Sequence, residues 1–321
     1  MNYESGIMKR IFKKIIIFII TLEARLVLQK YKPEIVVVTG SVGKTGVKDA
    51  IYTVLSRQFY TWKGEKSFNS EIGIPLTVLG SENAWGSISG WLKIIFEGIG
   101  LIFLKNHYPK MLVVEVGTDR PGDIEKVMQW LIPDVAVVTA FPEVPVHVEF
   151  FSSREALIKE KTHVVRALKP EGLLILNMDD SDVYALKKLF PHNTLTFGEN
   201  QNADIRIMNP YVEYDDTGHP VGMFGKISHQ QNQLPIHLKG VVGTHMFVSH
   251  LAALAVGIGK GINIVSGVES LVDFSPPPGR MRILEGLHDS VIIDDSYNAS
   301  PAAVHAALST LESIHKAAQE A

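Results

Sequence analysis

The stretch Ile35-Val36-Val37-Val38-Thr39-Gly40-Ser41-Val42-Gly43-Lys44-Thr45 decides the fold expected for this chain. β-Branched residues lead into a turn with two glycines, and apolar residues at helical spacing follow from Val47 to Leu55. This order predicts a strand, a phosphate-binding loop and a helix. The glycines let main-chain N–H groups approach an anion, and the positive end of the helix dipole attracts it. The predicted phosphate-binding residues are Gly40, Ser41, Val42, Gly43, Lys44 and Thr45.

Two side chains of this loop carry the expected chemistry. Lys44 can reach the β- and γ-phosphates of a nucleotide, and the Thr45 hydroxyl can bind Mg²⁺. Val38 stands where the common form of the motif has its first glycine. The alternative is a tight strand–helix turn with a chance lysine. The order of strand, glycines, Lys-Thr and helix favours the phosphate loop.

The bulk composition limits the classes of function. A length of 321 residues is typical of about two domains, and a hydrophobic content of 46% allows a large buried core. The formal net charge of −3 gives no support for a nucleic-acid partner. The chain has no cysteine, which excludes disulfides, thiolate metal sites and a cysteine nucleophile.

The N-terminal segment is basic and apolar. Residues 9–32 hold seven lysines and arginines against Glu23 alone, around the apolar run at 15–20. That run is too short to span a bilayer, which takes about 20 apolar residues. Two interpretations stay open: an amphipathic helix on the inner membrane face, or a helix packed on the main domain. Because a phosphate loop needs nucleotide, the sequence predicts a cytoplasmic protein, with membrane association through residues 9–32 as the open alternative.

Apolar runs separated by helical segments predict an α/β fold with a mostly parallel sheet of the P-loop type, flanked by helices. The strands are expected at 35–39, 59–62, 111–117, 135–139 and 173–177, and helices at 88–104, 124–131 and 153–168. Residues 88–104 could be buried, docked on the surface or face a membrane. Ligands of such sheets bind beyond the carboxyl ends of the strands. Thr45, Glu115, Thr139 and Asn177 lie at or just past such ends.

The second half of the chain changes pattern. Short strand-like pieces at 195–197, 204–208, 223–227 and 234–238 predict a small antiparallel sub-sheet, and a helix is expected at 243–257. Ser275-Pro276-Pro277-Pro278-Gly279 predicts a stiff hinge. Two strand candidates and a helix from Pro301 then suggest the start of a second α/β domain. The predicted units are the N-terminal helix at 1–32, the ATP-binding domain at 33–275, and the hinge with an incomplete C-terminal domain at 276–321.

These residues together resemble the Mur ligase family, over about 34–305. The phosphate loop without its first glycine is similar to the family's shortened form. Further similar motifs are Asn69-Ser70-Glu71-Ile72-Gly73-Ile74-Pro75-Leu76, Val114-Glu115-Val116-Gly117, His147-Val148-Glu149, Lys159-Glu160-Lys161, Pro278-Gly279-Arg280-Met281 and Asp294-Asp295-Ser296-Tyr297-Asn298-Ala299.

The resemblance implies roles for individual residues. It makes Glu115 a Mg²⁺ ligand, His147 a ligand of a second metal, and Lys161 a carbamylated lysine whose new oxygens suit a hard cation. The implied metal ligands are Thr45, Glu115, His147 and Lys161, and the implied catalytic residues are Lys44, His147 and Lys161. Further nucleotide contacts are implied at His245, Arg280, Asp295 and Tyr297.

The resemblance also implies the reaction. Mur ligases use ATP and Mg²⁺ to activate a carboxylate as an acyl phosphate, which an amine then attacks. The similarity is strongest to the members that add D-Ala-D-Ala to a UDP-muramoyl peptide in peptidoglycan precursor synthesis. Two alternatives remain: the same chemistry on another substrate, such as a lipid-linked cell-wall precursor, or a nucleotide-binding module without turnover.

The chain departs from the family pattern at several positions. Met246 and Ser249 stand where two asparagines near the adenine are usual, Ala140 stands in place of an asparagine, and Gly46 in place of a serine or threonine. The resemblance also leads us to expect that a domain for the uridine-diphosphate sugar and most of the C-terminal domain lie outside this sequence.

Overall fold

The computed structural model describes residues 2–65, 68–144, 150–272, 274–288 and 290–320, with side chains from residue 11 to residue 315. Nine strands of this part form one sheet in the order β2-β3-β1-β4-β5-β6-β7-β8-β9. These strands are β1 (Glu34–Thr39), β2 (Thr61–Lys63), β3 (Met111–Glu115), β4 (Val135–Val138), β5 (Leu173–Asn177), β6 (Thr194–Gly198), β7 (Ile205–Tyr214), β8 (Pro220–His229) and β9 (Asn232–Lys239). The sheet is parallel from β2 to β7 and antiparallel from β7 to β9.

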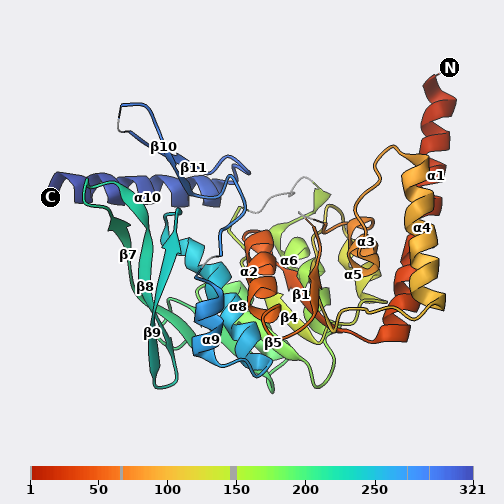
Figure 1. The fold of residues 1–321 in the computed structure, drawn as a ribbon, viewed down its shortest axis with the longest axis horizontal. Coiled ribbons are helices and arrows are strands. Elements are labelled where there is room, and N and C mark those ends of the chain that lie inside the picture. The colour runs from red at the N-terminus through yellow and green to blue at the C-terminus, as the bar shows by residue number, and fades with distance from the viewer. Residues whose placement is uncertain (1, 66–67, 145–149, 273, 289, 321) are drawn as a thin grey trace.

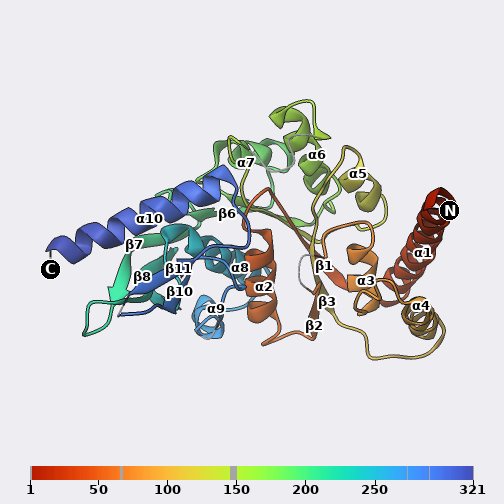
Figure 2. The same ribbon diagram turned by 90° about the horizontal axis from the view of Figure 1, so that it is seen from above.

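Helices cover both faces of this sheet (Figures 1 and 2). One face is covered by α2 (Lys44–Leu55), α8 (Phe247–Gly259) and α9 (Ile264–Ser270). The other is covered by α1 (Asn2–Tyr31), α3 (Gly73–Leu79), α4 (Ile88–Phe103), α5 (Asp123–Met128), α6 (Arg154–Arg166) and α7 (Ser181–Ala185). Two 3₁₀ turns, η2 (Leu186–Leu189) and η3 (Thr244–Met246), lie next to α7 and α8.

The place of β1 at the centre of the sheet explains why its residues 35–38 are all apolar. Val36 and Val38 point into the core beneath α2 and α8, whereas Ile35 and Val37 point into the core beneath the opposite helices. Successive side chains of a strand alternate between the two faces, and here both faces are buried. All four side chains are at most 5% exposed. The predicted α/β class with a mostly parallel sheet is therefore confirmed.

The position of residues 195–197 differs from the prediction. They were expected in the antiparallel sub-sheet, but β6 pairs in parallel with β5, with Leu176 opposite Thr196. The antiparallel strands β7 to β9 continue the same sheet instead of forming a separate one. The short crossover through α7 and η2 makes the parallel pairing feasible, and its few residues gave no strong helical period in the sequence.

The N-terminal helix α1 packs on the main body of the protein. Ile16, Ile20, Ala24 and Val27 are buried in the core that also holds residues of α3 and α4. The packed-helix interpretation of residues 9–32 is thus confirmed. Among the described residues, no helix combines the length and the apolar character needed to cross a membrane.

The C-terminal segment begins after the proline-rich stretch. Strands β10 (Arg282–Glu285) and β11 (Val291–Asp294) form an antiparallel pair, followed by α10 (Pro301–Glu320). The pair joins the end of the main sheet, where the Ile283 N–H donates to the Gly240 carbonyl at 2.9 Å. The domain boundary near residue 275 stays a prediction.

One buried histidine makes the stability of the fold depend on pH. His250 in α8 is 1% exposed, its Nε2 has no hydrogen-bond partner, and burial lowers its pKa from 6.5 to about 4. Between those values the unfolded chain binds a proton that the folded chain does not. The free energy of unfolding should therefore fall as the pH drops from 6.5 towards 4, by about 3 kcal/mol from this group.

Urea unfolding across this pH range checks the prediction. In the His250→Leu variant, the fall in the free energy of unfolding between pH 6.5 and 4 should be smaller by about 3 kcal/mol, because leucine has no site for the proton. His192→Leu is the matched control, because His192 is exposed and its removal should leave the profile unchanged. Equal acid sensitivity of the wild type and His250→Leu would contradict the assignment.

Candidate active site

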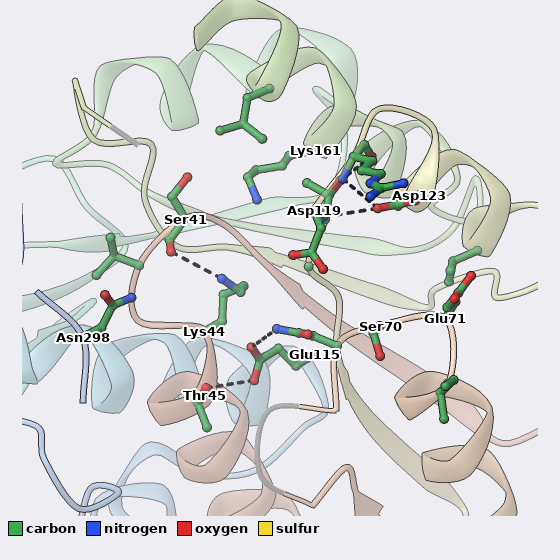
Figure 3. Close-up of a pocket in the computed structure, with 18 of the residues that line it drawn as sticks. Ser41, Lys44, Thr45, Ser70, Glu71, Glu115, Asp119, Asp123, Lys161 and Asn298 are labelled. Atoms are coloured by element: carbon green, nitrogen blue, oxygen red, sulfur yellow. Dashed lines mark hydrogen bonds between the residues drawn. The ribbon is translucent and has the colours of Figure 1, made fainter. Parts of the chain in front are cut away.

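A cavity of about 970 Å³ opens beyond the carboxyl ends of β1 and β3. Separate parts of the chain line it: helix α1, the loop after β1, the loop before α3, the segment from the end of β3 through α5, helix α6, residues 279–280 and the segment after β11. Figure 3 shows Lys44, Glu115 and Lys161 reaching toward one another from α2, β3 and α6. This is the edge of the sheet where the sequence predicts ligand binding.

The loop between β1 and α2 has the backbone of an anion cradle. Gly40 has φ 136° and Gly43 has φ 81°, both in the region that favours glycine. The end of β4 holds this loop in place: the Thr139 hydroxyl donates to the Val42 carbonyl at 2.6 Å, and the Ser41 N–H donates to the Ala140 carbonyl at 2.8 Å. The first residues of α2, Lys44 and Thr45, line the cavity, so the positive end of the helix dipole lies there.

A carboxylate and a hydroxyl meet at the floor of the cavity. The Thr45 hydroxyl donates to Glu115 Oε2 at 3.0 Å, and Asn69 Nδ2 donates to Oε1 at 3.1 Å (Figure 3). Glu115 is only 2% exposed. Its two partners fix the carboxylate plane, so that an oxygen pair from Thr45 and Glu115 faces the phosphate loop.

Two lysines place positive charge above that oxygen pair. Lys44 Nζ donates to the Ser41 carbonyl at 3.3 Å, and Lys161 Nζ donates to the Gly40 carbonyl at 3.0 Å. Burial lowers the pKa of Lys44, an effect that Glu115 opposes. Burial, reinforced by the charge of Lys44, lowers the pKa of Lys161 to about 7. A substantial fraction of Lys161 is therefore a neutral amine near pH 7.

The segment after the hinge contributes the outer wall. Arg280 lies over the ring of Tyr297, with Cζ 4.3 Å from the ring centroid, and its Nε is buried without a hydrogen-bond partner. Asp295 accepts a hydrogen bond from the Met281 N–H at 3.3 Å, and burial raises its pKa. Gly279, with φ 73°, passes close to the Tyr297 N–H. Arg280, Asp295 and Tyr297, which the sequence predicts as nucleotide contacts, all line the cavity.

Two of the predicted site residues are not confirmed by the structure. His147 lies outside the described residues, so its role as a metal ligand stays a prediction. His245 in η3 is exposed and is not among the residues that line the cavity. Its predicted contact with nucleotide also stays a prediction.

The sequence did not reveal how several residues shape the cavity. Asn69 binds Glu115 from a loop 46 positions away in the chain, and Thr139 holds the phosphate loop across 97 positions. Asn298 also lines the cavity, as does one side of α1, which carries Lys13, Ile17, Thr21 and Arg25. The similarity of residues 69–76 to the family motif was the available signal for Asn69, but it did not reveal which group the amide contacts.

The described residues fit a magnesium nucleotide. Thr45 and Glu115 offer hard oxygen ligands 3.0 Å apart, and Arg280 Nε is a buried donor without a partner. Within the described part of the chain, no group of three or more His, Asp or Glu could hold a metal alone. Mg²⁺ commonly takes one or two carboxylates and completes its shell with phosphate oxygens and water, so this donor set suits it.

Gly40 is expected to tolerate no side chain. A Cβ at this position would overlap the Thr139 hydroxyl and approach the Ala140 nitrogen to 3.1 Å. We expect Gly40→Ala to cost about 3 kcal/mol, against about 1 kcal/mol for Gly218→Ala. Gly218 is the matched control because it also has positive φ, at 85°, but open space around its Cβ position. Equal losses for the two variants in urea unfolding would show that the contact with Thr139 is unimportant.

Comparison with known proteins finds relatives of this chain. Residues 99–257 match the family model of the Mur ligase middle domain. The chain is 28% identical over 292 residues to the UDP-N-acetylmuramoyl-tripeptide–D-alanyl-D-alanine ligase of Bacillus subtilis, covering 91% of this chain and 55% of the relative. The corresponding ligase of Escherichia coli is 25% identical over 294 residues, covering 90% and 57%. The chain thus spans about half the length of the curated relatives it matches.

Comparison with solved structures finds two MurF proteins of similar fold. MurF from Acinetobacter baumannii superposes with a TM-score of 0.73 at 21% identity, covering 92% of this chain and 57% of that one, which shows a common fold. MurF from Thermotoga maritima, solved in complex with ADP, superposes with a TM-score of 0.72 at 25% identity, covering 92% and 61%.

Proposed function

We propose that this chain is an ATP-dependent ligase of the MurF type, because residues 99–257 match the family model of the Mur ligase middle domain. It would join a carboxylate to an amine. The observation that supports this most directly is the convergence of Lys44, Lys161 and the Thr45–Glu115 pair around the phosphate loop. Such a site neutralises the charge of transferring phosphate without any covalent help from the protein.

Each residue has a role in this proposal. The loop N–H groups and Lys44 bind the phosphates of ATP, and Thr45 with Glu115 would hold Mg²⁺. Arg280 and Tyr297 contact the nucleotide from the side of the hinge. Lys161, as a carbamate, would help to hold a second Mg²⁺ together with His147, as the family resemblance implies.

The proposed reaction has two steps and uses ATP as a substrate. A carboxylate oxygen bonds to the γ-phosphorus while the bond to ADP breaks, which gives an acyl phosphate. The amine then bonds to the acyl carbon, inorganic phosphate leaves and the nitrogen loses a proton. Lys44, beside the phosphate loop, stabilises the negative charge on the transferring group.

The cations that line the cavity favour an anionic acceptor. They are Lys13 and Arg25 of α1, Arg120 and Lys126, and Lys13 Nζ lies 3.4 Å from Glu71 Oε1. Opposing charges come from Glu71, Asp119 and Asp123, of which Asp123 already accepts hydrogen bonds from the N–H groups of residues 119 and 120. A substrate with carboxylates and phosphates would suit these cations. A UDP-muramoyl tripeptide, named for the relatives, has this chemistry, and D-Ala-D-Ala would be the amine.

A second candidate is the same ligation on a lipid-linked precursor. One observation favours it: α1 lines the cavity through Lys13, Ile17, Thr21 and Arg25, and exposes apolar side chains elsewhere on its surface. A helix with both features could serve an acceptor that is anchored in a membrane.

Substrate-dependent ADP release tests the proposal. We expect ADP only when ATP, a UDP-muramoyl tripeptide and D-Ala-D-Ala are all present, with amide product in equal amount. Release that requires a lipid-linked acceptor instead would favour the second candidate. ATP binding without any acceptor-dependent turnover would overturn both and leave a nucleotide-binding module.

A further inference from the structure

Helix α1 exposes one continuous apolar stripe. Its members recur every three or four residues, which places them on one side of the helix. They are Ile11, Ile15, Phe18, Leu22 and Leu26, each between 38% and 70% exposed. The buried side chains of α1 lie on a different side, so this stripe is additional to the packed face. A soluble surface rarely gathers so many large apolar side chains without a binding function.

Helix α4 exposes a second stripe of the same kind. Its members are Ile88, Leu92, Phe96, Ile99 and Phe103, between 40% and 78% exposed. Trp85, just before the helix, is also 78% exposed. The charged residues of α4, Lys93 and Glu97, pair with each other at 3.7 Å and lie outside this stripe.

The two stripes form one surface. Helices α1 and α4 lie side by side at the edge of the molecule (Figures 1 and 2). They run parallel: Glu23 packs against Gly98, and further along both helices Lys30 Nζ donates to the Leu101 carbonyl at 2.8 Å. An α-helix turns by about 100° per residue, so the angle between two side chains around the helix axis follows from their numbers. Glu23 and Gly98 mark where the two helices face each other. Around α1 the stripe lies about 100° from Glu23, and around α4 the stripe lies about 120° from Gly98 in the opposite direction of rotation, so both stripes face the same side.

The charge around this surface is positive. Lys14 and Arg25 flank the α1 stripe along one edge and Lys30 along the other, and all three are exposed. The only acidic residue of 9–32, Glu23, is 6% exposed and buried between the helices. An apolar surface with a basic rim and an exposed tryptophan complements the interface of an anionic membrane.

We propose that this α1–α4 face docks on the surface of a membrane that contains anionic lipids. The apolar stripes enter the boundary between headgroups and acyl chains, and Lys14 and Lys30 bind lipid phosphates. The inference does not depend on the proposed ligase activity. It places the cavity next to the membrane, because Ile17 and Arg25 line the cavity from the same helix.

Sedimentation with lipid vesicles tests the docking. We expect the full chain to bind vesicles of phosphatidylcholine with phosphatidylglycerol, and to bind pure phosphatidylcholine vesicles at least tenfold more weakly. Phe96→Ser with Phe103→Ser should lower the partition coefficient at least tenfold. Lys14→Glu should lower it about fivefold and reduce its sensitivity to salt.

The matched control removes apolar side chains from another exposed helix. Leu308→Ser with Leu311→Ser on α10 should leave vesicle binding unchanged, because these residues, 61% and 52% exposed, lie far from α1 and α4. Equal loss in this control would overturn the proposal, since it would indicate non-specific adhesion. Binding that ignores phosphatidylglycerol, or no binding at all, would also overturn it.

Two further measurements distinguish other occupants of the face. Tryptophan emission should shift to the blue when anionic vesicles are added, and Trp85→Phe should remove most of that shift. Sedimentation velocity without lipid should give the same mass for the wild type and Phe96→Ser with Phe103→Ser. A dimer that this double variant dissociates would overturn the proposal in favour of a second copy of the chain.

Discussion

Lys44→Ala should lower the rate of acceptor-dependent ADP release by about 10²–10³-fold. Lys44 begins α2 at the end of the phosphate loop, with Nζ 3.3 Å from the Ser41 carbonyl and in the field of Glu115. Alanine removes the positive charge beside the transferring phosphate and leaves the loop backbone intact. We therefore expect a large loss in kcat and weaker ATP binding, with little change in thermal stability.

Lys226→Ala is the matched control for the loss of one lysine. Lys226 lies in β8, exposed and outside the cavity lining, so its removal should leave turnover unchanged. A Lys44→Ala protein that keeps more than a tenth of the wild-type rate would remove the central support for phosphoryl transfer at this loop.

Lys161→Ala should lower the rate of acceptor-dependent ADP release by a similar factor. The wild-type rate should also depend on bicarbonate. A carbamate forms when a neutral amine bonds to the carbon of CO₂ and loses a proton. Burial and the charge of Lys44 lower the pKa of Lys161 to about 7, so the neutral amine becomes dominant as the pH rises above 7. Activity should fall when CO₂ is stripped from the buffer and return when bicarbonate is added, with a larger effect on the acid side.

Lys159 on the same helix provides the control, because it is exposed, whereas Lys161 is 4% exposed. Lys159→Ala should keep both the rate and the bicarbonate response. With ¹³C-labelled bicarbonate, the wild type should show a carbamate carbon signal by NMR that Lys161→Ala lacks. A fully active protein in CO₂-free buffer would refute the carbamate and leave Lys161 as a cation beside Gly40.

Much of the sheet could be predicted from local sequence because burial on both faces leaves a plain signal. The runs at 35–38, 111–114, 135–138 and 173–176 are apolar at every position, and each is a central strand. The edge of the parallel region was harder. In β6 only part of the strand is buried, so nothing local distinguishes a parallel partner from an antiparallel one.

The candidate site was predictable in its motifs and not in its contacts. The loop at 40–45 follows from glycine geometry, and the position of Glu115 follows from its place at a strand end. The contact of Asn69 with Glu115 and the support of the loop by Thr139 join residues far apart in the chain. No periodicity or spacing encodes such pairs, because the packing of separate elements brings them together.

By itself, the sequence determined the class of fold and the phosphate loop, since both depend on side-chain burial and backbone freedom over a few consecutive residues. Only the tertiary structure decided what α1 does. Its apolar residues occupy two sides of one helix, and the sequence cannot tell which side meets the protein. Packing against α3 and α4 buries Ile16, Ile20 and Val27, and leaves Phe18 and Leu22 exposed beside the stripe of α4. The third side of α1, with Arg25, completes the cavity.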